Sequence, residues 1–218
     1  MMKGGVILNP QNLIANILSL TLFSVALLIT LRAFYLCFQN VQGHNYRLFI
    51  LGLAMGVIAL TAIASFANDN IANLPLNVNW FKYIAQSVAF LFVCLSLISN
   101  ADTYLRRLMF WHIAISILLL LLLSPLLPGA FPNPSVTKMI LGGSRSLVCF
   151  AIFFFYVTAF MRKETRFSLL MSGSFLLLAT GYLLNMPKYL DAHLTLLDNI
   201  GDGVRIFGLI ILLVAIFL

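Results

Sequence analysis

Six polar or charged residues stand inside long apolar segments or close to where those segments begin. They are Lys82, Gln86, Arg145, Asp198, Asp202 and Arg205. A charge among apolar side chains is costly unless another group pairs with it, so such a residue is kept for a partner or a function. The planar guanidinium of arginine matches carboxylate and phosphate groups. Two arginines with nearby aspartates therefore predict a pocket for a small anionic or zwitterionic ligand.

The spacing of these residues places them on shared helix faces. Asp198, Asp202 and Arg205 follow one another at i, i+4 and i+7, which is one face of a helix. Lys82 and Gln86 share a face by the same rule. We therefore expect the polar residues of each segment to point in one direction.

Arg145 is the strongest candidate for a functional role. It lies about 10 Å further along its helix than Lys138, because a helix rises about 1.5 Å per residue, and its own helix offers it no carboxylate. Gln86 and Arg205 are expected at the same depth. Two alternatives stay open. Both arginines extend to the lipid headgroups, or Asp202 pairs with Arg205 for structure alone.

The composition identifies the surroundings of these residues. Of the 218 residues, 62% are hydrophobic and only 9% are charged, whereas a soluble domain carries roughly 25% charged residues. So few polar groups cannot cover a globule in water, and we expect an integral membrane protein. The formal net charge of +7 does not indicate nucleic-acid binding, because the basic residues stand between the apolar runs. There they set topology and meet the lipid bilayer.

Seven apolar segments approach the roughly 20 residues that a membrane-spanning helix needs. They cover 12–38, 47–67, 80–99, 108–127, 139–161, 167–185 and 199–218. The connections between them are too short to form a soluble domain. The sequence therefore predicts an all-α, polytopic membrane protein in which residues 1–218 form a single domain of seven transmembrane helices.

The basic residues give this bundle a direction. The connections after the first, third and fifth segments carry Arg47, Arg106, Arg107, Arg162, Lys163 and Arg166. The connections on the other side carry fewer cations, which are offset by aspartates. Because lysine and arginine favour the cytoplasmic side, we expect the amino terminus outside and the carboxyl terminus in the cytoplasm. The inner cations, with Arg32, are interpreted as contacts with anionic lipid at the cytoplasmic face.

The sequence gives little support for catalysis or for metal binding. The histidines of the chain are His44, His112 and His193. No two of them are placed to hold a haem across the bilayer, and no metal-binding motif occurs. The odd set of Cys37, Cys94 and Cys149 indicates neither disulfides nor a metal site, so we expect buried, unreactive thiols. We also expect a protein that is not an enzyme and that holds no metal or cofactor.

Two stretches carry a resemblance to a known group of proteins. One is LRAFYLCFQNVQGHNYRLFILGLAMGVIAL, an aromatic and basic hinge followed by a glycine-containing span. The other is GDGVRIFGLIILL, in which Asp202, Arg205 and Gly208 are spaced three residues apart. They resemble the seven-helix membrane sensor domains at the front of bacterial histidine kinases and diguanylate cyclases. The resemblance implies a bacterial inner-membrane protein whose last helix passes a signal to a cytoplasmic effector.

The sequence departs from that group at its end, because the chain stops at Leu218 without a linker helix or effector. We therefore expect either a module of a longer protein or a protein that acts through a partner. Three functions compete. The first is a ligand-binding sensor with an outward-facing pocket that signals through the seventh helix. The second is a structural or assembly subunit of a larger membrane complex, and the third is a small transporter.

Overall fold

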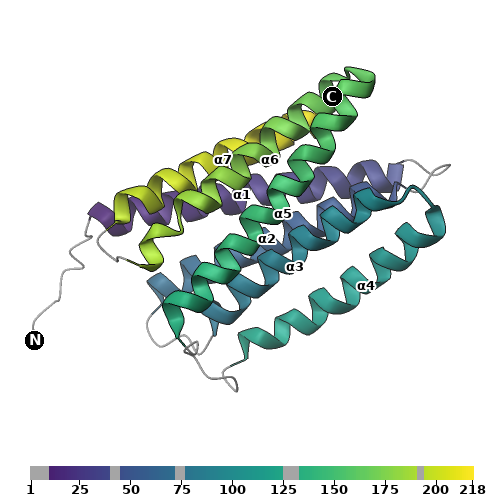
Figure 1. Cartoon of the computed structure of the whole chain (residues 1–218). Coiled ribbons are helices and arrows are strands. Elements are labelled where there is room, and N and C mark those ends of the chain that lie inside the picture. Colours follow the sequence, from purple (N-terminus) through teal and green to yellow (C-terminus); the bar gives the residue numbers. More distant parts are fainter. Residues whose placement is uncertain (1–9, 40–44, 72–76, 125–132, 191–193) are drawn as a thin grey trace, which may run out of the picture.

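A computed structural model describes residues 10–39, 45–71, 77–124, 133–190 and 194–218, and the described chain folds into helices (Figure 1). They are α1 (Pro10–Gln39), α2 (Tyr46–Asn70), α3 (Val78–Ile98), α4 (Asp102–Leu120), α5 (Pro134–Lys163), α6 (Arg166–Leu184) and α7 (Thr195–Phe217), with short 3₁₀ turns η1 (Leu121–Leu123) and η2 (Pro187–Tyr189). Within these residues, seven helices are long and apolar enough to cross a membrane. The predicted all-α class is confirmed, and the chain is a helical membrane protein.

Six of the helices form a closed ring, and one stands outside it. Around the ring, α1 packs on α2, α2 on α3, α3 on α5, α5 on α6, α6 on α7, and α7 returns to α1. Helix α4 packs only on the outer side of α2 and α3, and it lies apart from the others in Figure 1. Helices α1, α3, α5 and α7 all begin at the same end of the bundle, which we call the first end.

Two helices begin five or more residues earlier than the hydropathy predicted. Helix α4 starts at Asp102 instead of 108, and α5 starts at Pro134 instead of 139. Their first turns are polar, so an apolar window misses them, yet both are good helix starts. Asp102 in the first turn of α4 complements the positive end of the helix dipole. Pro134 at the start of α5 has the required backbone angle and lacks an N–H that would go unpaired.

At the end of the ring opposite to the first end, Arg47 of α2 binds the end of α3. Its Nε donates to the Ser96 carbonyl at 2.9 Å and its Nη2 donates to the Ser99 carbonyl at 3.1 Å. These carbonyls end α3 and have no partner within that helix. A residue that the sequence predicted as a determinant of topology therefore also caps the neighbouring helix.

The centre of the ring is apolar over most of its length. Phe90 and Phe175 are fully buried there, with ring centroids 6.5 Å apart, and Cys149 is buried with them. Cys37 and Cys94 are half-buried, so the expectation of buried thiols is correct only for Cys149. The apolar centre gives way to polar side chains toward the first end.

Candidate ligand-binding site

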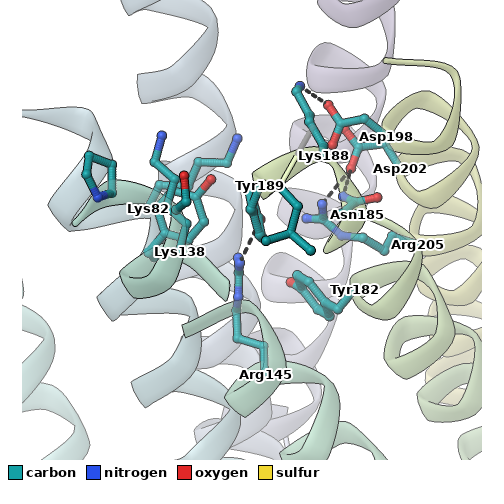
Figure 2. A pocket seen from close by; sticks show the side chains of 14 residues that line it. Lys82, Lys138, Arg145, Tyr182, Asn185, Lys188, Tyr189, Asp198, Asp202 and Arg205 are labelled. Atoms are coloured by element: carbon teal, nitrogen blue, oxygen red, sulfur yellow. Dashed lines mark hydrogen bonds and ion pairs between the residues drawn. The ribbon is translucent and has the colours of Figure 1, made fainter. Parts of the chain in front are cut away.

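A pocket of about 470 Å³ lies at the first end of the bundle, between α3, α5, α6, η2 and α7. Figure 2 separates its side chains into two groups with Tyr189 between them. We call Lys82 and Tyr83 of α3 with Lys138 and Arg145 of α5 the cationic wall. We call Asn185, Lys188, Asp198, Asp202 and Arg205 of α6, η2 and α7 the paired wall.

Arg145 is held at the bottom of the cationic wall by uncharged groups. Its side chain is buried, with 2% of the residue exposed. Its Nη1 donates to Gln86 Oε1 at 2.6 Å, its Nε to the Leu141 carbonyl at 3.3 Å, and its Nη2 to the Tyr189 hydroxyl at 3.5 Å. Among the described residues it forms no ion pair. The guanidinium is thus well oriented, and its charge is not neutralised.

A chain of hydrogen bonds fixes the side chain of Gln86, which accepts a hydrogen bond from Arg145. Gln86 Nε2 donates to the Thr61 hydroxyl at 2.7 Å, and that hydroxyl donates to the Ile58 carbonyl at 2.8 Å. Because its amide nitrogen is committed to α2, Gln86 presents its carbonyl oxygen to Arg145. Helices α2, α3 and α5 together therefore set the position of one guanidinium.

Tyr182 lies between the two buried arginines. The guanidinium carbon of Arg145 is 4.7 Å from the centre of its ring, and that of Arg205 is 4.4 Å away. Both distances fall within the range of cation–π attraction. Tyr182 is itself buried on α6, so this helix connects the two walls at their base.

On the paired wall the charges neutralise one another. Arg205 Nη1 lies 2.6 Å from Asp202 Oδ1, which also accepts a hydrogen bond from Asn185 Nδ2 at 2.8 Å. Lys188 forms an ion pair with Asp198 nearer the mouth. Both aspartates of the pocket lining therefore have cationic partners within their own wall.

The balance of charge in the pocket follows from these pairs. Of the described residues that line it, five are basic and two are acidic, and both acids belong to the ion pairs of the paired wall. Lys82 is within electrostatic reach of Asp198 and Asp202 but forms no ion pair with them. Three positive charges of the cationic wall remain without a counter-charge in direct contact.

Close helix contacts position the side chains of the pocket. A Cβ added at Gly181 of α6 would come within 2.8 Å of the Gly201 carbonyl and 3.1 Å of the Arg205 nitrogen on α7. At Gly142 of α5, it would meet the Tyr189 ring at 3.0 Å. Glycine at these two positions lets α7 and the η2 turn approach closely enough to face the pocket.

Aromatic side chains close the inner side of the pocket. Tyr182 packs edge-on against Phe90 with ring centroids 5.7 Å apart, and Phe90 packs in the same way against Phe175. The mouth lies at the opposite side, by the first turn of α5 and by exposed Leu190. The pocket is therefore open at the first end and blocked toward the middle of the bundle.

The structure brings the six predicted residues together. Five of them line the pocket, and the sixth, Gln86, binds Arg145 from behind and faces a small adjoining cavity. Arg145 and Arg205 are both buried inside the ring, which is not the arrangement of side chains that extend to lipid headgroups. The alternative pairing of Asp202 with Arg205 is present.

Several lining residues were not identified as candidates from the sequence. From the sequence, Lys138 and Lys188 counted only among the few cations on the side expected outside, with Lys138 also a marker of depth, and Tyr83 and Tyr189 had no assigned role. Two of the tyrosines directly follow pocket lysines in the sequence, at Lys82-Tyr83 and Lys188-Tyr189. This repeated lysine–tyrosine pair, near the start of α3 and in η2, was the sequence signal that could have identified these residues.

The histidines lie elsewhere or cannot be placed. His112 is buried on α4, where its ring stacks on Phe92 with centroids 4.3 Å apart. His44 and His193 fall outside the described residues. Within the described part of the chain, no three histidine, cysteine or acidic side chains gather as metal ligands would.

Comparison with models of known protein families, with curated proteins and with solved structures finds no match to this chain. The resemblance to bacterial sensor domains therefore rests on the two quoted stretches alone. The geometry of the pocket is therefore the main basis for a function of this protein.

Proposed function

We propose that this chain is a non-enzymatic sensor module of the membrane that binds a small polar molecule in the pocket at its first end. The buried guanidinium of Arg145 carries this proposal. A charge inside a membrane protein costs several kcal/mol and is retained at ligand and ion sites. Arg145 faces a pocket of a size typical for small molecules and has only uncharged acceptors around it.

The distribution of basic residues supports an outward-facing pocket. The cation-rich start of α4 and end of α5, with Arg106, Arg162 and Lys163, lie at the end of the bundle opposite to the pocket. If that end is cytoplasmic, as the positive-inside tendency favours, the amino terminus and the mouth of the pocket face outside. The resemblance to sensor domains favours the bacterial inner membrane, with a fused effector or a separate protein partner receiving the signal.

Helix α7 is the proposed route of the signal. It contributes Asp198, Asp202 and Arg205 to the pocket and continues without a break to Phe217 at the other end. A ligand that attracts Arg145 would weaken its contact with the Tyr182 ring, which also contacts Arg205. Since α6 and α7 touch closely at Gly181, such a change would alter how the two helices sit against each other.

Native mass spectrometry of the protein purified gently from its own membranes tests ligand binding. We expect one small molecule per chain in the natural protein and in Arg162→Ala, and none in Arg145→Ala. Arg162 is a matched control because it is an exposed arginine at the other end of the same helix. Equal retention of the molecule by both variants would contradict the proposed site.

The signal route needs a second readout on the same preparations. Spin labels on Met161→Cys and Leu218→Cys, both exposed at the end opposite to the pocket, report the distance between the ends of α5 and α7. We expect that distance to change between the ligand-bound protein and Arg145→Ala. An unchanged distance would exclude α7 as the route while leaving the binding site intact.

The alternative function, a structural or assembly subunit of a larger membrane complex, is favoured by the position of α4. This helix stands outside the ring and exposes Phe110, Trp111, Ile117 and Leu118. Further chains of defined stoichiometry in the native mass spectrum would support this alternative. A small transporter is the weaker proposal, because the aromatic side chains at Phe90 and Phe175 block the path inward.

A further inference from the structure

We infer that the pocket selects a small oxyanion with two or more negative charges, and that it discriminates against a zwitterion. This inference rests on the proposed ligand-binding function and specifies the chemical class of the ligand. Its basis is the difference between the two walls. Positive charge without a counter-charge lies on one wall, and every acidic group of the described lining is already paired on the other.

The cationic wall offers three charges to one ligand. Lys138 Nζ lies 5.9 Å from the centre of the Tyr83 ring, and the guanidinium carbon of Arg145 lies 4.9 Å from it. Both cations therefore gather around one aromatic ring, and Lys82 is the neighbouring residue on the same helix. A single monovalent group would leave most of this charge unbalanced in a partly desolvated site.

The paired wall is a poor receptor for an ammonium group. Asp202 Oδ1 already accepts hydrogen bonds from Arg205 and Asn185, and Asp198 is paired with Lys188. A zwitterion would have to share an aspartate that already neutralises a lysine or an arginine, so its own cation would meet little net negative charge. A multivalent anion makes no such demand, because it carries no cation that needs an acidic partner.

The donors of the cationic wall suit carboxylate and phosphate oxygens. Arginine presents a planar fork of N–H groups to such oxygens, and lysine supplies a mobile point charge. The same chemistry is found in a soluble dicarboxylate or phosphate and in the phosphate headgroup of an anionic lipid. The mouth of the pocket beside exposed Leu190 and the first turn of α5 is open to either source.

The test is a titration of the full chain in phosphatidylcholine nanodiscs at constant ionic strength. Potassium succinate, potassium phosphate and 4-aminobutyrate are added separately, and the melting temperature and the heat of binding are recorded. 4-Aminobutyrate is a zwitterion with the same four-carbon length as succinate. We expect saturable binding of succinate or phosphate and none of 4-aminobutyrate. Equal or tighter binding of the zwitterion would overturn the inference.

Charge variants on the two walls give effects of opposite sign. Lys138→Gln should weaken binding of the dianion by about tenfold, as expected for losing one charge about 6 Å from a dianion when the effective dielectric constant is close to that of water. Asp198→Asn should strengthen it by about fivefold, because Lys188 then loses its counter-charge. Lys163→Gln, an exposed lysine at the other end of α5, is the matched control. Weaker binding in Asp198→Asn would contradict the inference and favour a zwitterion.

Nanodiscs that contain phosphatidic acid separate the two sources of the anion. A melting temperature raised by phosphatidic acid and no longer responsive to succinate or phosphate identifies the lipid headgroup as the ligand. Binding of the soluble anions in both kinds of nanodisc identifies a free solute. If neither source binds while native mass spectrometry still retains a molecule that is lost in Arg145→Ala, the proposed function stands and this inference is wrong.

Discussion

On the paired wall of the pocket, Arg205 lies 2.6 Å from the carboxylate of Asp202, whereas on the cationic wall Arg145 is surrounded by a glutamine, a tyrosine and a backbone carbonyl. Both arginines are buried at the same end of the bundle, and both touch Tyr182. They differ only in the charge of their neighbours. One arginine completes a neutral structural unit, while the other keeps a positive charge with no counter-charge in direct contact.

This difference teaches how to separate structural from functional buried charge. A buried ion pair contributes little net stability, but removing one partner is strongly destabilising because the other charge remains buried alone. A buried charge that is held only by neutral groups already lacks a counter-charge in the folded protein. Its removal leaves no second charge unpaired, so it need not destabilise the fold. Loss of a charge should therefore lower the stability much more on the paired wall than at Arg145.

The largest effect is expected from Asp202→Ala. Arg205 would lose its counter-charge inside the ring, and we expect the free energy of unfolding to fall by about 3 kcal/mol. Reversible unfolding in mixed micelles with increasing dodecyl sulfate measures this change. The double variant Asp202→Ala/Arg205→Met should recover most of the loss, because no charge is then left unpaired. Equal losses in the single and double variants would show that the ion pair is not the cause.

An intermediate effect is expected from Gly181→Ala on α6. The added methyl group would press on the backbone of α7 at Gly201 and Arg205, and overpacking of this kind costs about 2 kcal/mol. Gly173→Ala is the matched control on the same helix, since a Cβ there has no neighbour within 4 Å. Both variants are compared by thermal unfolding in detergent. Similar melting temperatures would mean that the α6–α7 contact does not position the paired wall.

The smallest effect on stability is expected from Arg145→Met. This change removes a charge that lacks a counter-charge and keeps an apolar chain of similar length, so we expect the free energy of unfolding to change by less than about 1 kcal/mol. Unfolding in the same micelles provides the measurement, with Arg205→Met as the comparison. A loss as large as that of Arg205→Met would remove the distinction between the two walls.

Much of this architecture was predictable because it depends on local patterns. Seven apolar runs predicted seven helices, and the i, i+4, i+7 spacing placed Asp198, Asp202 and Arg205 on one face of α7. The polar starts of α4 and α5 were missed, because hydropathy measures contact with lipid and carries no signal for helix caps. The gathering of six polar residues at one end followed from their depth along their helices.

The partners of those residues could not be predicted, because they depend on which helices become neighbours. Nothing in the spacing of Gln86 and Arg145 requires α3 to lie beside α5 and α4 to stand outside. Likewise, the pairing of Lys188 with Asp198 requires the η2 turn to fold back over the start of α7.

The sequence by itself determined the membrane class, the seven helices and the end of the bundle at which polar groups gather, because hydrophobic length and helical period are properties of each segment alone. Only the tertiary structure decided that Arg145 would meet no carboxylate from a neighbouring helix. The pair of Arg205 with Asp202 lies within one helix, whereas the partner of Arg145, the uncharged amide of Gln86, depends on the order of helices around the ring. That order is set by packing between segments far apart in the chain.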